Sequence, residues 1–133
     1  MNRYDALKAP NPQQWLAAVE QHRINLVEDF HRRERIDLPN AQIHAVVHVI
    51  VENQIALAED VPVRTLKRLQ QEGLDRHDAI HAMAMVMMEY LPSILTAEPA
   101  NTAGIGDPGN SFIEALEKLT ADSWRHSMDD EEN

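Results

Sequence analysis

Four of the seven histidines form two pairs with one spacing, His44-x3-His48 and His77-x3-His81. Residues four apart on a helix point in nearly the same direction and lie roughly 6 Å apart along the axis. Two imidazoles placed in this way can bind one cation, at about 2.0–2.1 Å from each nitrogen for zinc. Seven histidines scattered at random would give roughly 0.4 such pairs, so the repeated spacing favours a metal site.

Two carboxylates extend this pattern. Glu52 continues the stripe of His44 and His48, and Glu89 lies two turns beyond His81, on a face rotated by roughly 80°. Because Glu52 is about 12 Å from His44 along the helix, one ion cannot easily use both. Glu52 is therefore either a ligand, of the same ion or of a second one, or a residue that orients a ligand. The alternative for both glutamates is a solvated or salt-bridged carboxylate at a helix edge.

The predicted ligands define the class of metal. They are His44, His48, His77, His81, Glu52 and Glu89. Nitrogen and oxygen ligands suit a divalent transition metal such as Zn, Fe, Mn or Ni, and the absence of cysteine excludes thiolate ligands. Asp78, between the second pair, is a candidate to orient an imidazole N–H.

Other polar and polarisable residues have a simpler structural interpretation. We expect His22 to be a core histidine. The run His31-Arg32-Arg33 falls in the last turns of the first predicted helix, where cations suit the helix dipole, so no binding site is predicted there. The methionines between residues 83 and 88 are interpreted as pliable core packing rather than as a copper site.

Helix start and stop signals account for every long segment. The predicted helices run from Asn11-Pro12 to about Arg35, from about Asn40 to Glu59, from Val63 to Glu72, from Asp75 to a proline end or kink at Pro92, and onward from Ser111. The second is apolar nearly all round, which predicts a central position. With four glycines and no long β-branched alternation, the sequence predicts an all-α bundle of about four to five helices in which the two paired-histidine helices pack together.

The predicted organisation is one domain over residues 1–133, with a loop at 97–110 and a disordered acidic tail at 128–133. The net charge of −10 argues against a nucleic-acid-binding protein. The N-terminus lacks a signal-peptide pattern, and no uncharged stretch approaches the ~20 residues of a membrane span. We therefore expect a cytoplasmic protein without a membrane partner, and a homo-oligomer is compatible with the sequence.

The run His44-Ala-Val-Val-His48-Val-Ile-Val-Glu52-Asn-Gln54, followed by His77-Asp-Ala-Ile-His81 and Glu89, resembles a bacterial family of small proteins known as a domain of unknown function. The resemblance covers about a third of the chain. It implies an all-helical fold with the paired histidines together, and it implies no activity. The chain differs from that family's pattern at Met85, where a second acid often follows the last histidine, and in lacking a nearby cysteine and tryptophan.

Two functional hypotheses follow. The first is a metal-binding helical protein with a histidine-rich site between two helices, either a small metalloenzyme or a metal sensor. Catalysis would need an open coordination position and a base such as Glu52 or Glu89, whereas four histidines that close the shell would favour a structural or sensing role. The second is a non-catalytic interaction module whose histidines are structural or pH-sensitive. Common enzyme motifs such as HExxH are absent from the sequence.

Overall fold

A computed structural model of the chain describes residues 3–36, 40–96 and 108–132. Within these ranges every regular element is a helix, as the sequence predicts. The helices are α1 (Pro12–Ala17), α2 (Glu20–Arg33), α3 (Ala41–Ala56), α4 (Asp60–Gln71), α5 (Arg76–Thr96), α6 (Pro108–Lys118) and α7 (Ala121–Glu132). The described part of the chain thus holds more helices than the four to five expected.

The first predicted helix is divided in two, and this accounts for part of the difference. Asn11 caps α1 through a bond from the Gln14 N–H at 3.0 Å, as expected. The backbone then becomes extended at Ala18, and the apolar side chain of Val19 is 71% exposed. The guanidinium of Arg23 donates to the carbonyl of Ala18 at 3.0 Å, which satisfies an acceptor left free by the break.

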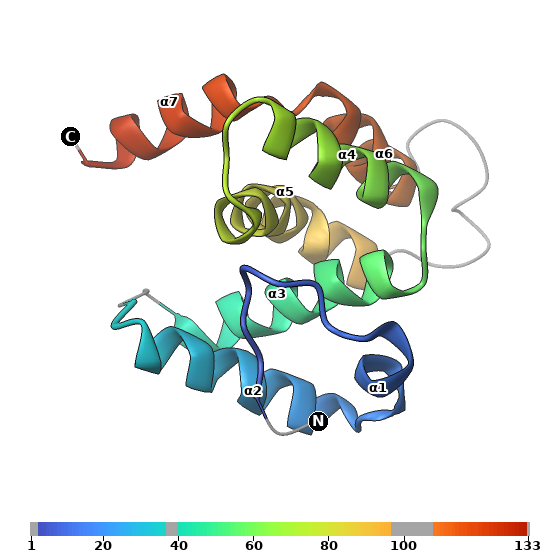
Figure 1. The fold of residues 1–133 in the computed structure, drawn as a ribbon. Coiled ribbons are helices and arrows are strands. Elements are labelled where there is room, and N and C mark those ends of the chain that lie inside the picture. Colours follow the sequence, from blue (N-terminus) through green and yellow to red (C-terminus); the bar gives the residue numbers. More distant parts are fainter. Residues whose placement is uncertain (1–2, 37–39, 97–107, 133) are drawn as a thin grey trace.

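Helix α3 is central, as its apolar sequence predicts. It packs against α1 and α2 on one side and against α4 and α5 on the other (Figure 1). Val47 and Val51 belong to an apolar cluster shared with α4, α5 and α6. Ala45 and Val49 belong to a second cluster with α2 and the N-terminal residues. Because both sides are covered, an apolar surface nearly all round is the composition that this position requires.

The turn between α4 and α5 sets where the second histidine pair begins. Gly73 has a φ of +108°, a conformation that residues with a side chain rarely adopt. Its N–H and that of Leu74 bond to the carbonyls of Gln70 and Leu69, each at 3.1 Å, which closes α4. Asp75 then accepts the N–H of Asp78 at 2.8 Å and caps α5. The sequence predicts this helix to start at Asp75, where the cap is found.

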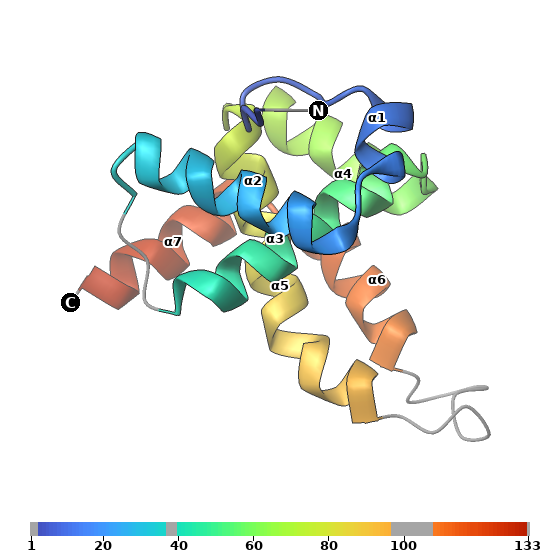
Figure 2. The same cartoon turned by 90° about the horizontal axis from the view of Figure 1, so that it is seen from below.

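The C-terminal third differs from expectation at several helix ends. Helix α5 continues past Pro92 to Thr96, so the proline does not end it. Helix α6 begins at Pro108 rather than Ser111, and α7 runs to Glu132 across most of the segment predicted to be a disordered tail. The rest of the predicted loop, 97–107, lies outside the described residues. The last turns of α5 extend beside α6 (Figure 2).

No helix in the described ranges combines the length and the apolar character needed to cross a bilayer.

Candidate metal site

Four histidines meet where α2, α3 and α5 pack together. Each of His31, His48, His77 and His81 offers one ring nitrogen, and these four nitrogens all lie within 4.8 Å of one another. The Nε2 of His81 is 3.2 Å from that of His31 and 3.0 Å from that of His77. We call these four residues the histidine cluster. The cluster thus brings together, from three different helices, four side chains of a type that can bind a metal ion.

The cluster agrees with the predicted ligand set at three of four histidines. His48, His77 and His81 are brought together as expected. His31, interpreted from sequence as a helix-end cation, is buried in the cluster, so that interpretation is wrong. His44 is half-buried one turn before His48 and is close enough to affect the electrostatics of His31 and His81. The sequence does contain a signal for His31. It lies four residues after Val27, one helical turn further along the same buried face of α2.

Burial favours the neutral form of all four imidazoles. It lowers the pKa of His31 to about 4 and that of His81 to about 3, and in each case neighbouring imidazoles add to the effect. Burial also lowers the pKa of His48 well below its ordinary value and lowers that of His77. A neutral imidazole is the form that carries a free lone pair for a metal ion.

Behind His48 lies a buried ion pair that includes one predicted ligand. Glu52 is fully buried, and its two carboxylate oxygens accept from Nη1 and Nη2 of Arg76 at 2.8 and 2.7 Å. Tyr4 also donates its hydroxyl hydrogen to Oε2 of Glu52. The carboxylate is therefore bound by an arginine and a tyrosine that the sequence pattern does not predict as its partners. Neither could be found by spacing, because Tyr4 and Arg76 are far from Glu52 in the chain.

Tyr4 connects this ion pair to the cluster. Its hydroxyl oxygen is 2.7 Å from Nε2 of His48. The segment that carries it precedes α1 and runs past α3 toward α5 (Figure 1). Arg33 donates to the carbonyl of Tyr4 at 2.7 Å, and Arg76 donates to that of Ala6 at 3.0 Å. Burial, followed by the charge of Glu52, raises the pKa of Tyr4, so the side chain is a neutral phenol.

Two other residues singled out from the sequence, Glu89 and Asp78, are not members of the histidine cluster. Glu89 is exposed and lines a hollow of about 180 Å³ with Met85 and Trp124, a hollow to which none of the four histidines contributes. Asp78 is half-buried, and burial followed by the charge of Asp75 raises its pKa. Its expected role of orienting an imidazole stays a prediction.

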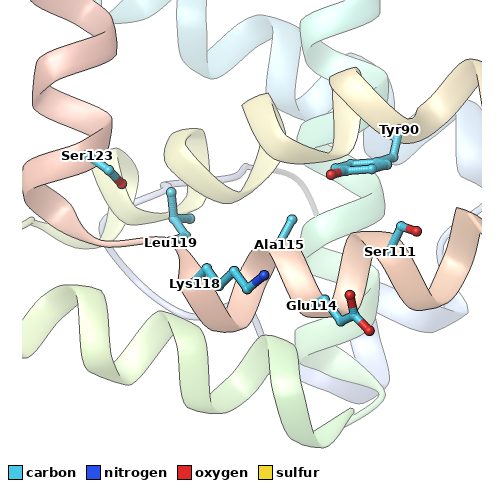
Figure 3. A pocket seen from close by; sticks show the side chains of 7 residues that line it. All are labelled: Tyr90, Ser111, Glu114, Ala115, Lys118, Leu119 and Ser123. Carbon is cyan, nitrogen blue, oxygen red and sulfur yellow. The ribbon is translucent and has the colours of Figure 1, made fainter.

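Two further hollows flank the bundle. One, of about 480 Å³, is lined by His31 together with residues of α2 and the start of α3. The other, of about 390 Å³, lies between α5, α6 and α7 and is lined by Tyr90, Glu114 and Lys118 among others (Figure 3). Only the first borders the histidine cluster.

Comparison of the chain with protein-family models, with curated proteins and with solved structures finds no match. The resemblance drawn from the paired histidines stays a prediction.

Proposed function

We propose that this protein binds one divalent transition metal ion through His31, His48, His77 and His81. The observation that carries the proposal is the convergence of four ring nitrogens within 4.8 Å of one another. In a tetrahedral site with metal–nitrogen distances of about 2.0–2.1 Å, the nitrogens lie about 3.3–3.4 Å apart. The two nitrogen pairs around His81, at 3.0 and 3.2 Å, are already near that separation.

Hydrogen bonding within the cluster also supports a cation. The Nε2 of His81 faces two other Nε2 atoms, and a neutral imidazole offers at most one hydrogen there. Nδ1 of His48 is buried and has no hydrogen-bond partner among the described residues. A buried polar atom without a partner is costly, and a metal ion that accepts its lone pair would remove that cost.

The ligand set favours a role in holding or sensing a metal over hydrolysis. Four imidazoles complete a tetrahedral shell and leave no position for water or substrate. Glu52 is held by Arg76, and Glu89 is exposed outside the cluster, so neither is placed as a general base for this ion. An all-imidazole shell suits Zn, Ni or Fe better than Mn.

The test is metal content and stability in protein purified without a nickel column. We expect close to one metal ion per chain, and at a zinc(II) concentration 100 times Kd a stabilisation of about 2.7 kcal/mol. His31→Ala should abolish stoichiometric binding, whereas His44→Ala should retain it, and this pair separates the cluster from the ligand set predicted by sequence. The exposed His126→Ala serves as a neutral control.

A metal content below ~0.2 per chain, with no thermal shift on adding Zn, Fe, Mn or Ni, would contradict the proposal. It would favour the second candidate, an interaction module with structural histidines. The observation behind that candidate is that His81 already contacts both His31 and His77 through their ring nitrogens.

A further inference from the structure

We propose that a buried chain of hydrogen bonds fixes the tautomer of His48 and so selects the nitrogen through which it binds metal. The chain begins at Arg76 and passes through Glu52 and Tyr4. It holds the hydrogen of His48 on Nε2, which leaves Nδ1 as its ligand atom, while the other three histidines bind through Nε2. The metal-binding half of this inference rests on the proposed function. The tautomer itself belongs equally to the metal-free protein.

The direction of each hydrogen bond follows from what each group can donate. Arg76 has only donors, and it directs two N–H groups at the two oxygens of Glu52. Glu52 is thereby an acceptor, and it also receives the hydroxyl hydrogen of Tyr4. A phenol has one hydrogen, so the Tyr4 oxygen has only lone pairs left for its second contact.

That second contact is Nε2 of His48, 2.7 Å from the Tyr4 oxygen. Two atoms at this distance need one hydrogen between them, and the phenol has already given its own to Glu52. The hydrogen must therefore be on Nε2. In a neutral imidazole the other nitrogen, Nδ1, then carries the free lone pair.

The surroundings of Nδ1 agree with this assignment. Nδ1 of His48 is buried and receives no hydrogen bond from any residue that the structure describes, whereas Nε2 is already used by Tyr4. In the rest of the histidine cluster, Nε2 of His81 lies close to Nε2 of His31 and to Nε2 of His77. In a site with three Nε2 ligands and one Nδ1 ligand, each of the four rings therefore uses its free lone pair to bind the ion.

Tyr4 is accordingly a positioning residue for the site. A partner that holds the second nitrogen of a ligating histidine fixes its ring orientation, and its loss typically costs 10–100-fold in metal affinity. This partner comes from the segment before α1, which is itself anchored through the carbonyls of Tyr4 and Ala6.

The test is a long-range proton–nitrogen NMR correlation of the imidazole rings, recorded without metal and with one equivalent of zinc(II). We expect the His48 ring to show the Nε2–H pattern in both spectra. In the zinc-loaded protein His31, His77 and His81 should show the opposite pattern, Nδ1–H. Tyr4→Phe keeps the ring but removes the oxygen, so it should mix the tautomers of His48 and weaken zinc binding by 10–100-fold.

Tyr90→Phe is the matched control, because Tyr90 is the second tyrosine and lines a hollow apart from the cluster. It should change neither the His48 spectrum nor zinc affinity. A His48 ring with its hydrogen on Nδ1 would overturn the proposal, as would a Tyr4→Phe protein with an unchanged His48 pattern. If wild-type protein binds no zinc, the proposed function fails, yet the metal-free spectrum still decides the tautomer, even if Tyr4→Phe does not fold.

Discussion

The two halves of α5 are stabilised in different ways. Its first turns carry Arg76, His77 and His81, whose polar atoms each meet a particular atom on another residue. The following turns carry Met83 and Met87, which are buried in an apolar cluster with residues of α4 and α6. Apolar packing depends mainly on volume, whereas a buried polar group depends on one correctly placed partner. The first half should therefore be sensitive to chemical identity and the second to size.

The largest effect is expected when a buried charge loses its partner. Arg76→Met should destabilise the metal-free protein by about 3–5 kcal/mol, because it leaves the carboxylate of Glu52 buried and unpaired. Urea denaturation measures this loss. Adding Glu52→Gln to the same protein removes the charge and should restore part of the stability. A loss below about 1 kcal/mol for Arg76→Met would mean that the ion pair contributes little.

In the apolar half, the loss should follow volume. Met83→Ala creates a cavity in a fully buried position and should cost about 2–5 kcal/mol, whereas Met83→Leu should cost less than about 1.5 kcal/mol. Urea denaturation and a zinc titration provide the measurements. Neither variant should alter zinc affinity by more than a few-fold. A large change in affinity with Met83→Leu would show that the two halves are not independent.

Acid should weaken the polar half selectively. The pKa of His31 is lowered to about 4 and that of His81 to about 3, so below the ordinary value of 6.5 the unfolded chain binds protons that the folded chain does not. Stability of the metal-free protein is then intact above pH 6.5 and declines as the pH falls toward 4 and 3. His81→Gln should make this decline shallower in denaturation measured at several pH values. An equal decline in both proteins would contradict the assignment.

The smallest effect concerns the cap that starts α5. Asp75→Ala removes the acceptor for the Asp78 N–H and should cost about 1 kcal/mol. Because the first turn of α5 carries His77, zinc affinity should also fall, by less than for Tyr4→Phe. Asn11→Ala removes the equivalent cap of α1 and is the matched control. It should cost similar stability and leave zinc affinity unchanged.

Local signals predicted a large part of this molecule. The helix starts at Asn11 and Asp75 and the central position of α3 depend on residues within a few positions of each other, and all were readable from the sequence. The break at Ala18 was not, because the carbonyls it frees are satisfied by Arg23, five residues on, and nothing in the helical pattern signals it.

The histidine site shows the same difference between local and tertiary determinants. Spacing by itself determined that His77 and His81 share a face of one helix, because that relation is set by helical geometry within a single segment. Tertiary structure alone decided that His31 completes the cluster and that Glu52 turns to Arg76 and Tyr4. Those outcomes depend on how α2, α3 and the N-terminal segment pack across one another. The partner of a buried polar group is chosen by that packing, because desolvation makes any unpaired alternative costly.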